Sequence, residues 1–372
     1  MTREDFFHDW FQEPGAYVLV DGQFGSTGKG LLAGVIAENC AERIDMVTTN
    51  AGPNSGHTAY FDHDGWGGIA PERYEHVMTQ QLPVASVFAN KMGHGRRIKT
   101  ILNAGAIIDP DTLLNEVAAH AMYLPHVIIH PCAAMITQKH RDEDQATVGR
   151  IAGTGKGIGP AIIDKVRRDY GAVAAGEYHP MLPVGFPPHL SFDRMYDWRN
   201  DRVFVETAQG FSLGLNSARF YPHVTSRECT VAQALADARI PAGRLRKVVM
   251  CLRTYPIRVG NTDTGRSGDG YPDQREITWQ DIGVEPEMTT VTKRVRRVFT
   301  WSRTQFREAV AANEPNVLFL NFCNYYPDMP VAESGLGSLI DSMREDYVSV
   351  MGRPWDKLLL GYGKHSHDIV QY

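Results

Sequence analysis

The sequence has little that would place it in a membrane or outside the cell. No stretch of its 372 residues approaches the roughly eighteen apolar residues that span a bilayer. The first ten residues are charged and lack the continuous apolar region of a secretion signal. Its five cysteines are odd in number and form no CxxC pair, which argues against a disulfide framework or a zinc site. We therefore expect a soluble, cytoplasmic protein with reduced, mostly buried thiols.

An excess of one charge is also missing. With 38 Lys and Arg against 43 Asp and Glu, the formal net charge is −5. Such a chain has no global attraction to nucleic acid or to an anionic membrane, so we expect neither as a partner. No repeat, low-complexity tract or proline-rich linker divides the chain. We expect one catalytic domain over residues 16–372, preceded by an aromatic-rich extension over residues 1–15 that includes a short helix.

The sequence does contain a glycine-rich loop directly after an apolar run. Residues 18–21 predict a buried strand, and helical spacing of apolar residues follows over residues 29–40. The glycines of the loop can bring backbone N–H groups within reach of phosphate oxygens, and Lys29 adds a point charge. The glycines are Gly22, Gly25, Gly28 and Gly30.

This loop departs from the usual P-loop pattern. Five residues instead of four separate Gly22 from Gly28, and position 30 is glycine where a Ser or Thr would hold magnesium. A metal ligand must therefore come from elsewhere. A glycine-rich turn with no ligand stays open as the alternative.

The remaining elements alternate between strands and helices. This order predicts an α/β fold with a mainly parallel central sheet and a P-loop-like phosphate loop after the first strand. The dense Gly, Asp, Thr and Ser content of residues 260–273 predicts a long loop. We predict helices over residues 109–120 and 230–239, and strands over residues 127–129, 248–252 and 316–322. Residues 203–210 predict a strand that runs into a polar turn, and residues 357–363 predict a strand that runs into a glycine turn.

Three further polar segments are candidates for ligand contact. Residues 50–58 form a Gly/Asn/Ser loop that includes His57. Residues 149–168 combine glycines with Lys and Arg, which suits an anion as well as it suits a solvated helix. Residues 289–298 are the most basic segment, with an alternation that predicts an edge strand. They could grip a carboxylate or phosphate, contact nucleic acid, or form a solvated edge.

Taken together, these segments resemble the adenylosuccinate synthetase family, in order and through almost the whole chain. Each motif is weak alone, but the ordered set is specific. The matching segments are Gly25 to Gly30, Asn54 to Thr58, Gly153 to Pro160, Asp164 to Arg168, Ala208 to Gly210, Val224 and Thr225, Arg258 to Gly260, Thr292 to Arg297 and Gly361 to Gly363.

In this family a nucleoside triphosphate phosphorylates O6 of IMP, and the amine of L-aspartate then displaces that phosphate at C6. The resemblance implies that Lys29 binds the triphosphate, His57 the transferring phosphoryl group and Gln209 the purine O6, with Ser26 beside them as the fourth catalytic residue. It implies an Mg²⁺ site at Gly56 and Ser26, and a homodimer in which Arg168 reaches the other subunit. The remaining implied contacts are Asn54, Thr154, Thr225, Val259 and Arg168 for the acceptor nucleotide, Thr292, Arg294 and Arg296 for L-aspartate, and Gly25, Thr27, Gly28, Gly30, Asn324, Gly361 and Gly363 for the donor nucleotide.

One departure from the family concerns the acceptor. The family's aspartate in the glycine loop, which removes the N1 proton and ligates magnesium, is Ser26 here. A hydroxyl is no base at neutral pH without an activator, but it is small and can accept a hydrogen bond from an exocyclic amine. Ser26 therefore suggests dGMP, the substrate of the phage-associated 2-aminoadenylosuccinate synthetases. Such a protein would work in the host cytoplasm.

The second departure concerns the donor. Where the family reads guanine with a Lys-x-Asp pair, this chain has Phe322 and Asn324. An amide offers one donor and one acceptor, which fits the N1 and N6 edge of adenine, and Phe322 could stack on it. We expect ATP or dATP.

The expected activity is thus a ligase that forms N6-succino-2-amino-2′-deoxyadenylate from dGMP and L-aspartate. The alternatives are an ordinary synthetase acting on IMP, an inactive nucleotide-binding homologue and, least favoured, a switch protein. The base that replaces the family aspartate stays open between Asp21, a water or hydroxide on magnesium, and the bound L-aspartate.

Overall fold

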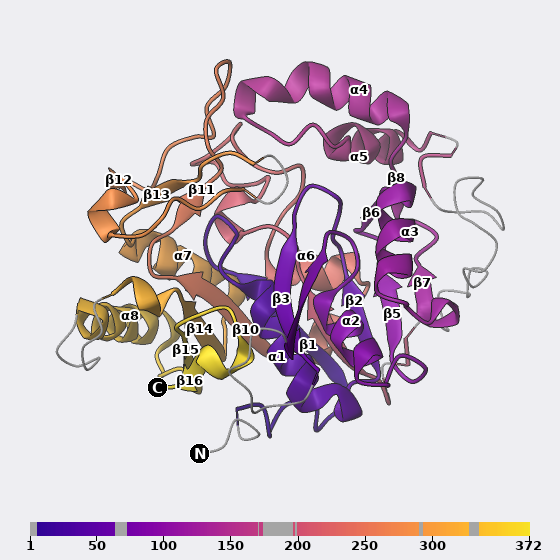
Figure 1. The fold of residues 1–372 in the computed structure, drawn as a ribbon, viewed down its shortest axis with the longest axis horizontal. Helices are drawn as coiled ribbons and strands as arrows, with labels where there is room; N and C mark the ends of the chain where they lie inside the picture. The colour runs from indigo at the N-terminus through magenta and orange to yellow at the C-terminus, as the bar shows by residue number, and fades with distance from the viewer. Residues whose placement is uncertain are drawn as a thin grey trace.

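A computed structural model describes residues 6–63, 73–169, 171–173, 196–197, 199–289, 293–326 and 335–372. Within these residues the largest sheet has nine strands in the order β16-β15-β14-β10-β1-β9-β2-β5-β7 (Figure 1). Every neighbouring pair is parallel except β15 and β16, which confirms the predicted α/β fold with one mainly parallel sheet. The strands are β1 (Gly15–Asp21), β2 (Met46–Thr49), β5 (Lys99–Leu102), β7 (Val127–Ile129), β9 (Arg202–Glu206), β10 (Leu245–Arg253), β14 (Val317–Asn321), β15 (Lys357–Gly361) and β16 (Ile369–Gln371).

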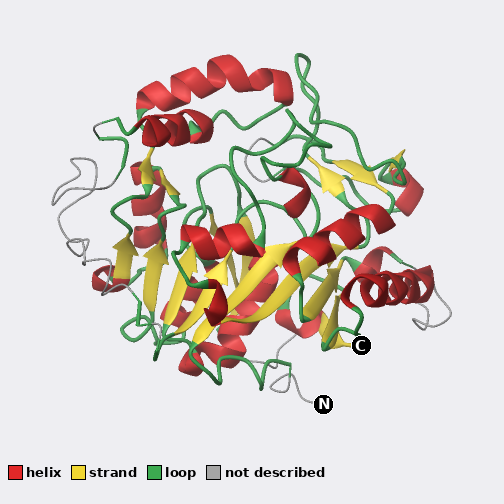
Figure 2. Cartoon of the chain, turned by 180° about the vertical axis from the view of Figure 1, so that it is seen from behind, coloured by secondary structure: helices red, strands yellow, loops and turns green. Residues whose placement is uncertain are grey.

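Helices cover both faces of this sheet (Figure 1 and Figure 2). In β1, Tyr17 and Leu19 pack into the core on one face, whereas Val18 and Val20 pack into the core on the other. A strand that is apolar on both sides is typical of the middle of a parallel sheet. The first core includes α1 (Lys29–Cys40) and α2 (Val84–Lys91), and the second includes α6 (Val231–Asp237), α7 (Arg303–Asn313) and α8 (Gly335–Met351).

Smaller elements surround the main sheet. A three-stranded sheet in the order β11-β13-β12 lies apart from it, beside the long loop of residues 260–273 (Figure 1). The smaller elements are β3 (His57–Asp62), β4 (Tyr74–Thr79), β6 (Ile107–Ile108), β8 (Ala134–Met135), β11 (Ile257–Arg258), β12 (Glu276–Ile277), β13 (Arg297–Phe299), α3 (Pro110–Ala119), α4 (Gln138–Thr147) and α5 (Ile158–Arg167).

Most predicted elements are present at or near their predicted bounds. The helix over residues 29–40 and the strand over residues 127–129 match the observed α1 and β7 in extent, and the strand predicted to begin at residue 357 is β15, which ends at Gly361 before the predicted turn. Asp109 caps α3 by accepting a hydrogen bond from the N–H of Thr112. The predicted edge strand over residues 289–298 is wrong. Among its described residues only the last two belong to a strand, β13, and that strand lies in the middle of its sheet.

The N-terminal segment differs from its prediction. Residues 6–11 form turns where we expected a short helix. Phe7, Trp10 and Phe11 are fully buried and pack into the core beside Tyr17 of β1. Burial of these three rings compensates for the lack of helical hydrogen bonds, because each aromatic side chain removes a large apolar area from water.

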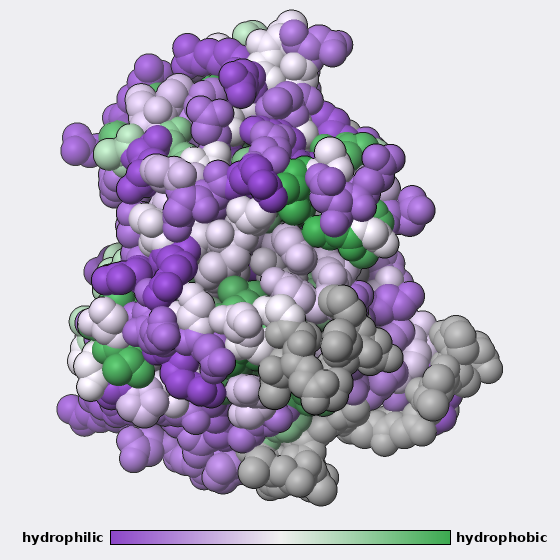
Figure 3. Space-filling model, turned by 90° about the vertical axis from the view of Figure 1, so that its left-hand side faces the viewer, coloured by the Kyte–Doolittle hydropathy of each residue, from purple (hydrophilic) through white to green (hydrophobic). Residues whose placement is uncertain are grey.

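The burial of the cysteines agrees with the prediction of mostly buried thiols. All five cysteines are free, and four of them are buried, with Cys132 exposed. The side of the molecule that carries the small sheet and α8 is mainly hydrophilic, with small apolar patches (Figure 3). Across the described ranges, no helix is both long enough and apolar enough to cross a bilayer.

Candidate active site

A cavity of about 680 Å³ opens beyond the carboxyl end of β1, where the glycine-rich loop leaves the sheet. In open α/β sheets ligands bind at the carboxyl ends of the strands, because the loops there carry polar groups and helix N-termini. Most of the residues that the sequence predicted for the site line this cavity. They are Gly25, Ser26, Thr27, Gly28, Lys29, Gly30, Asn54, Gly56, His57, Thr154, Gln209, Val259, Arg296, Asn324 and Gly363.

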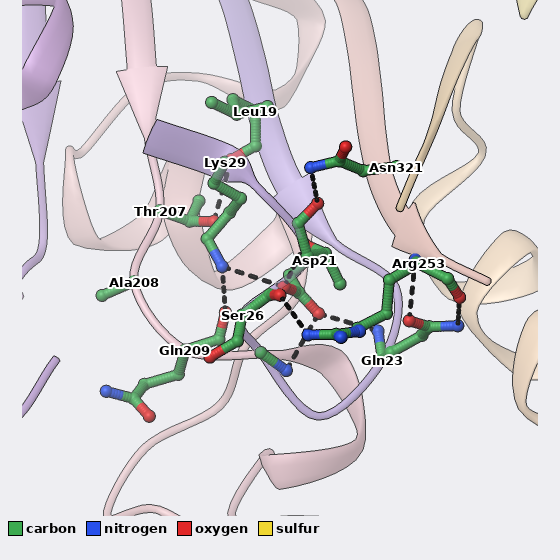
Figure 4. Close-up of polar contacts among 12 residues, drawn as sticks. Leu19, Asp21, Gln23, Ser26, Lys29, Thr207, Ala208, Gln209, Arg253 and Asn321 are labelled. Atoms are coloured by element: carbon green, nitrogen blue, oxygen red, sulfur yellow. Dashed lines mark hydrogen bonds and ion pairs between the residues drawn. The ribbon is translucent and has the colours of Figure 1, made fainter. Parts of the chain in front are cut away.

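Asp21, the last residue of β1, holds the glycine-rich loop together. One carboxylate oxygen accepts the N–H groups of Gln23 at 2.8 Å and Gly25 at 3.1 Å. The other accepts the Thr27 hydroxyl at 2.5 Å and the Lys29 ammonium at 3.0 Å (Figure 4). Asp21 is 1% exposed and is not among the residues that line the cavity, which argues against its use as the missing base.

Lys29 lies between the loop and the end of β9. Its ammonium donates to Asp21 and, at 2.7 Å, to the backbone carbonyl of Gln209 (Figure 4). An ammonium carries three N–H donors, and these two contacts leave the third for a ligand. The arrangement supplies a fixed cation at the start of α1, where the N-terminal end of the helix already favours an anion.

Two glycines are required by close contacts of the loop. Gly28 has φ 95, and a Cβ there would lie 2.2 Å from the side-chain nitrogen of Asn321. A Cβ on Gly30 would lie 2.8 Å from the backbone nitrogen and oxygen of Thr58. Glycine at position 30 therefore lets α1 approach the start of β3, which brings Lys29 and His57 to the same part of the cavity.

Several polar groups at the cavity lack partners. The side-chain oxygen atoms of Asn54 and Ser55 and the side-chain nitrogen of Gln209 are buried without a hydrogen-bond partner among the described residues. Figure 4 shows the Gln209 amide pointing away from Lys29. Buried polar groups are normally paired, so unpaired ones at a cavity wall indicate a ligand that pairs with them.

The backbone at the cavity is strained. Ser26, Gln209 and Phe322 are non-glycine residues with φ between 56 and 68, in the left-handed region. All three line the cavity. Such residues persist only where the surrounding structure holds them, and they cluster at binding and catalytic sites.

Ser26 and Arg296, which are far apart in the sequence, meet in the cavity. The guanidinium of Arg296 donates to the Ser26 hydroxyl at 2.7 Å. Burial lowers the pKa of Arg296 to about 10, so it stays charged at neutral pH. A hydroxyl oxygen that accepts this bond keeps a second lone pair, with which it can accept a ligand N–H.

His57 is held in its neutral form. Burial and the charge of Lys29 lower its pKa to about 3. A neutral imidazole has one N–H donor and one acceptor nitrogen, so His57 can donate one hydrogen bond to a phosphoryl oxygen without adding a full charge.

One part of the cavity wall is built from η10 (Cys323–Tyr325) and the turn after β15. Asn324 is exposed on η10, and Gly363 and Lys364 contribute from the turn. Asn321 ties this end to the glycine-rich loop, because its amide donates to the Thr27 carbonyl at 3.4 Å. The ring of Phe322 lies under the Arg253 guanidinium, 3.9 Å from it, so one ring face is already covered.

Five predicted site residues are not brought to the cavity wall, or lie outside the described residues. Thr292 belongs to the second group. Arg294 donates to the carbonyls of Ala152, Gly153 and Gly260, beside the cavity. The other three are Thr225, whose N–H donates to the Leu213 carbonyl, Arg168 at the exposed C-terminal cap of α5, and Gly361 at the end of β15.

Sequence reasoning missed some residues of the cavity. The clearest are Glu287, Asn321, Tyr325 and Lys364, and Arg253 just behind the wall. A signal existed for Arg253, because a charge that ends the apolar strand β10 must find a buried partner. No local pattern indicated which partner.

The cavity offers oxygen ligands for a hard cation but no acidic cluster. Ser26 and Gly56 both line it. Across the described residues, no group of three or more His, Cys, Asp or Glu is placed to hold a metal ion. Mg²⁺ commonly takes few protein ligands and completes its shell with phosphate oxygens and water, so a hydroxyl and a carbonyl fit it when it arrives with a triphosphate.

Known proteins resemble this chain over nearly its whole length. Residues 18–176 and 192–331 match the family model described as adenylosuccinate synthetase. The N6-succino-2-amino-2′-deoxyadenylate synthase of Salmonella phage PMBT28 is 38% identical over 376 residues, which cover 95% of this chain and 96% of that protein. Its counterpart from Cyanophage S-2L is 36% identical, with 89% of each chain covered.

Solved structures of known proteins also resemble this chain over nearly its whole length. The cyanophage S-2L succinoaminodeoxyadenylate synthetase, bound to dGMP and to dATP as an energy donor, gives a TM-score of 0.79 at 33% identity, covering 97% of this chain and 96% of that chain. Adenylosuccinate synthetase from Plasmodium falciparum shares the fold, with a TM-score of 0.71 at 17% identity, covering 96% of this chain and 99% of that one. The chain therefore belongs to the adenylosuccinate synthetase family.

Proposed function

We propose that this protein is a ligase that joins L-aspartate to dGMP and forms N6-succino-2-amino-2′-deoxyadenylate. It cleaves ATP or dATP to the diphosphate and inorganic phosphate. The observation that carries the proposal is Ser26, a hydroxyl at the cavity wall, in a chain 36–38% identical to four phage proteins that bear this enzyme name. We propose residues 16–372 as the catalytic domain and the host cytoplasm as the place of action.

The reaction has two steps. In the first, a general base takes the N1 proton of the guanine, O6 attacks the γ-phosphorus of the donor, and the bond to the diphosphate breaks. In the second, the amine of L-aspartate attacks C6, the C6–O6 bond breaks to release phosphate, and the amine nitrogen gives up a proton to solvent. The protein's part is to align the groups and to stabilise charge, because phosphoryl transfer depends on positioning and electrostatics more than on covalent catalysis.

Each step has candidate groups at the cavity. The third N–H of Lys29 and the N-terminal end of α1 would bind the triphosphate, and the N–H of neutral His57 would donate to the moving phosphoryl group. The unpaired amide nitrogen of Gln209 would donate to purine O6. The Ser26 hydroxyl would accept a hydrogen bond from the 2-amino group through its free lone pair, whereas a carboxylate at that position would crowd the amine.

The two nucleotides would take different parts of the wall. We place the acceptor between Asn54, Thr154 and Val259, with Thr225 beside it, and the adenine of the donor at Asn324, near the Gly361 to Gly363 turn. L-Aspartate would reach Arg296 inside the cavity, with Arg294 beside it; the third contact that we propose, Thr292, lies outside the described residues. Mg²⁺ would arrive with the triphosphate and be held by the Gly56 carbonyl and by the Ser26 hydroxyl, once L-aspartate has drawn Arg296 away from that hydroxyl and freed a lone pair; bound there, it would draw charge from the phosphate oxygens.

Arg168 would complete the acceptor site of a second subunit in a homodimer. It ends α5, is exposed and does not line its own cavity. The same helix exposes two apolar side chains, Ile163 at 45% and Val166 at 70%. An apolar helix face beside an unused arginine supports a subunit contact that buries the first and supplies the second to the neighbour.

Phosphate release with L-aspartate tests the proposal. IMP, GMP and dGMP are each assayed with ATP, dATP and GTP, and the Lys29→Ala variant serves as the inactive control. We expect dGMP with ATP or dATP to give the highest kcat/KM. A wild-type preference for IMP would replace the proposal with an ordinary adenylosuccinate synthetase, and no turnover with any pair would indicate an inactive homologue.

A further inference from the structure

A carboxylate and a guanidinium that no sequence motif singled out meet at the cavity wall. Among the described residues, Glu287 is the one carboxylate that lines the cavity. The fully buried side chain of Arg253 donates to both of its oxygens, with Nη1 3.2 Å from Oε2 and Nη2 bonded to Oε1. Burial opposes ionisation of Glu287, but the charge and hydrogen bonds of Arg253 outweigh it and hold its pKa below the ordinary value.

This pair contacts the residues proposed to bind the acceptor and L-aspartate. The same Nη1 atom of Arg253 that bonds Glu287 also donates to the backbone carbonyl of Ser26 at 3.2 Å. The backbone carbonyl of Glu287 accepts the N–H of Arg296 at 2.8 Å. The Ser26 to Arg296 contact is thus held from both ends by one ion pair.

The pair also contacts the segment proposed to read the donor base. Oε1 of Glu287 accepts the Tyr325 hydroxyl at 2.7 Å, and the Arg253 guanidinium lies 3.9 Å over the ring of Phe322. Phe322 and Tyr325 flank Asn324, which has no hydrogen bond among the described residues that would fix it independently.

We propose that Arg253 and Glu287 form a positioning pair. The pair holds three segments in place relative to one another: the glycine-rich loop at Ser26, the segment before β13 at Arg296, and η10 at Asn324. The proposal rests on the proposed function for the identity of the ligands. Breaking the pair would leave the buried guanidinium of Arg253 without a counterion.

Glu287 is not placed to act as the missing general base. Both of its oxygens already accept hydrogen bonds from Arg253, and one accepts a third from Tyr325. A carboxylate satisfied in this way binds a proton weakly, because protonation would cost it those bonds. Its role is therefore exerted through Arg253, Tyr325 and Arg296.

Tyr325→Phe tests the donor branch of the pair. It removes one hydroxyl, with its bond to Glu287 and its interaction with Arg253, but keeps the ring and both bonds between Arg253 and Glu287. Tyr326→Phe is the matched control, because the neighbouring Tyr326 stacks on Tyr255 and is not bonded to Glu287. Calorimetry measures the Kd of a non-hydrolysable ATP analogue and of dGMP separately. We expect Tyr325→Phe to weaken the ATP analogue roughly 3–10-fold, with dGMP and both Kd values of the control unchanged.

Glu287→Gln tests the whole pair. It keeps the shape but leaves Arg253 unneutralised, so we expect both ligands to weaken roughly tenfold or more. Thermal unfolding checks the fold, and Tyr325→Phe still decides the question if Glu287→Gln does not fold. The proposal is overturned if Glu287→Gln binds both ligands like wild type, or if Tyr325→Phe weakens dGMP as much as the ATP analogue. Failure of wild type to bind dGMP would refute the proposed function alone, and the variants would then be compared with the nucleotide that wild type does bind.

Discussion

Replacement of Ser26 by aspartate tests what sets the acceptor base. Ser26 has φ 56 and its hydroxyl lies 2.7 Å from Arg296. Aspartate tolerates the left-handed region, so the loop should keep its shape, but the added carboxylate would occupy the space proposed for the 2-amino group. Overpacking of a filled site costs about 1–3 kcal/mol, which is roughly 5–150-fold in kcat/KM for dGMP. IMP lacks that amine, so the kcat/KM for IMP should not fall for this reason.

The assay is the ratio of kcat/KM for dGMP over IMP at saturating donor and L-aspartate. Ser26→Ala keeps the space and loses one neutral hydrogen bond, about 0.5–1.5 kcal/mol, so the ratio should fall only roughly 2–13-fold. Ser26→Gly is the control for the backbone, because glycine relieves the positive φ while it also removes the hydroxyl. An unchanged ratio in Ser26→Asp would show that Ser26 does not set the choice of acceptor base.

Four other changes give further tests. His57→Asn should lower kcat roughly 10²-fold or more with little change in KM, and an unchanged kcat would make the histidine structural. Because the pKa of His57 is lowered to about 3, its neutral form persists from pH 5 to 8, and a rate limb near pH 6.5 that disappears in this variant would contradict the assignment. Asn324→Asp should shift kcat/KM from ATP toward GTP, and a wild-type preference for GTP would overturn that expectation. Mixing Arg168→Ala chains with Lys29→Ala chains should restore one active site per heterodimer; mixed dimers without rescue would place Arg168 outside the neighbouring site. Asp21→Asn should lower the free energy of unfolding by about 3–5 kcal/mol, since the buried Lys29 loses its counterion; a fully stable variant that has lost only kcat would instead identify Asp21 as the base.

Local patterns in the chain were sufficient for the elements that carry the glycine-rich loop of the cavity. The helix over residues 29–40 could be predicted at its observed bounds, because Gly28 precedes it and apolar side chains recur at helical spacing. In the structure this glycine has φ 95. The apolar stretch of β1 likewise indicated a buried strand. The identity of Ser26 in the loop was visible in the motif, because the relevant information is one residue type at one position.

Contacts between distant segments were not predictable, because they depend on the order of the strands. β1 lies between β9 and β10, and this order brings Lys29 to the Gln209 carbonyl and Ser26 to Arg253. Arg296 meets Ser26 across 270 positions of sequence.

Burial of the N-terminal aromatic rings and the pairing of Glu287 could not be predicted either, because both depend on contacts between distant segments. An apolar or charged residue must find a complementary surface, but its own neighbourhood in the sequence does not say which one. Trp10 packs beside Tyr17 in the core that covers one face of β1, and Glu287 pairs with Arg253 because the segment before β13 lies against the end of β10. Those pairings follow from the packing of the whole domain, and they shape the part of the cavity in which acceptor and donor are expected to meet.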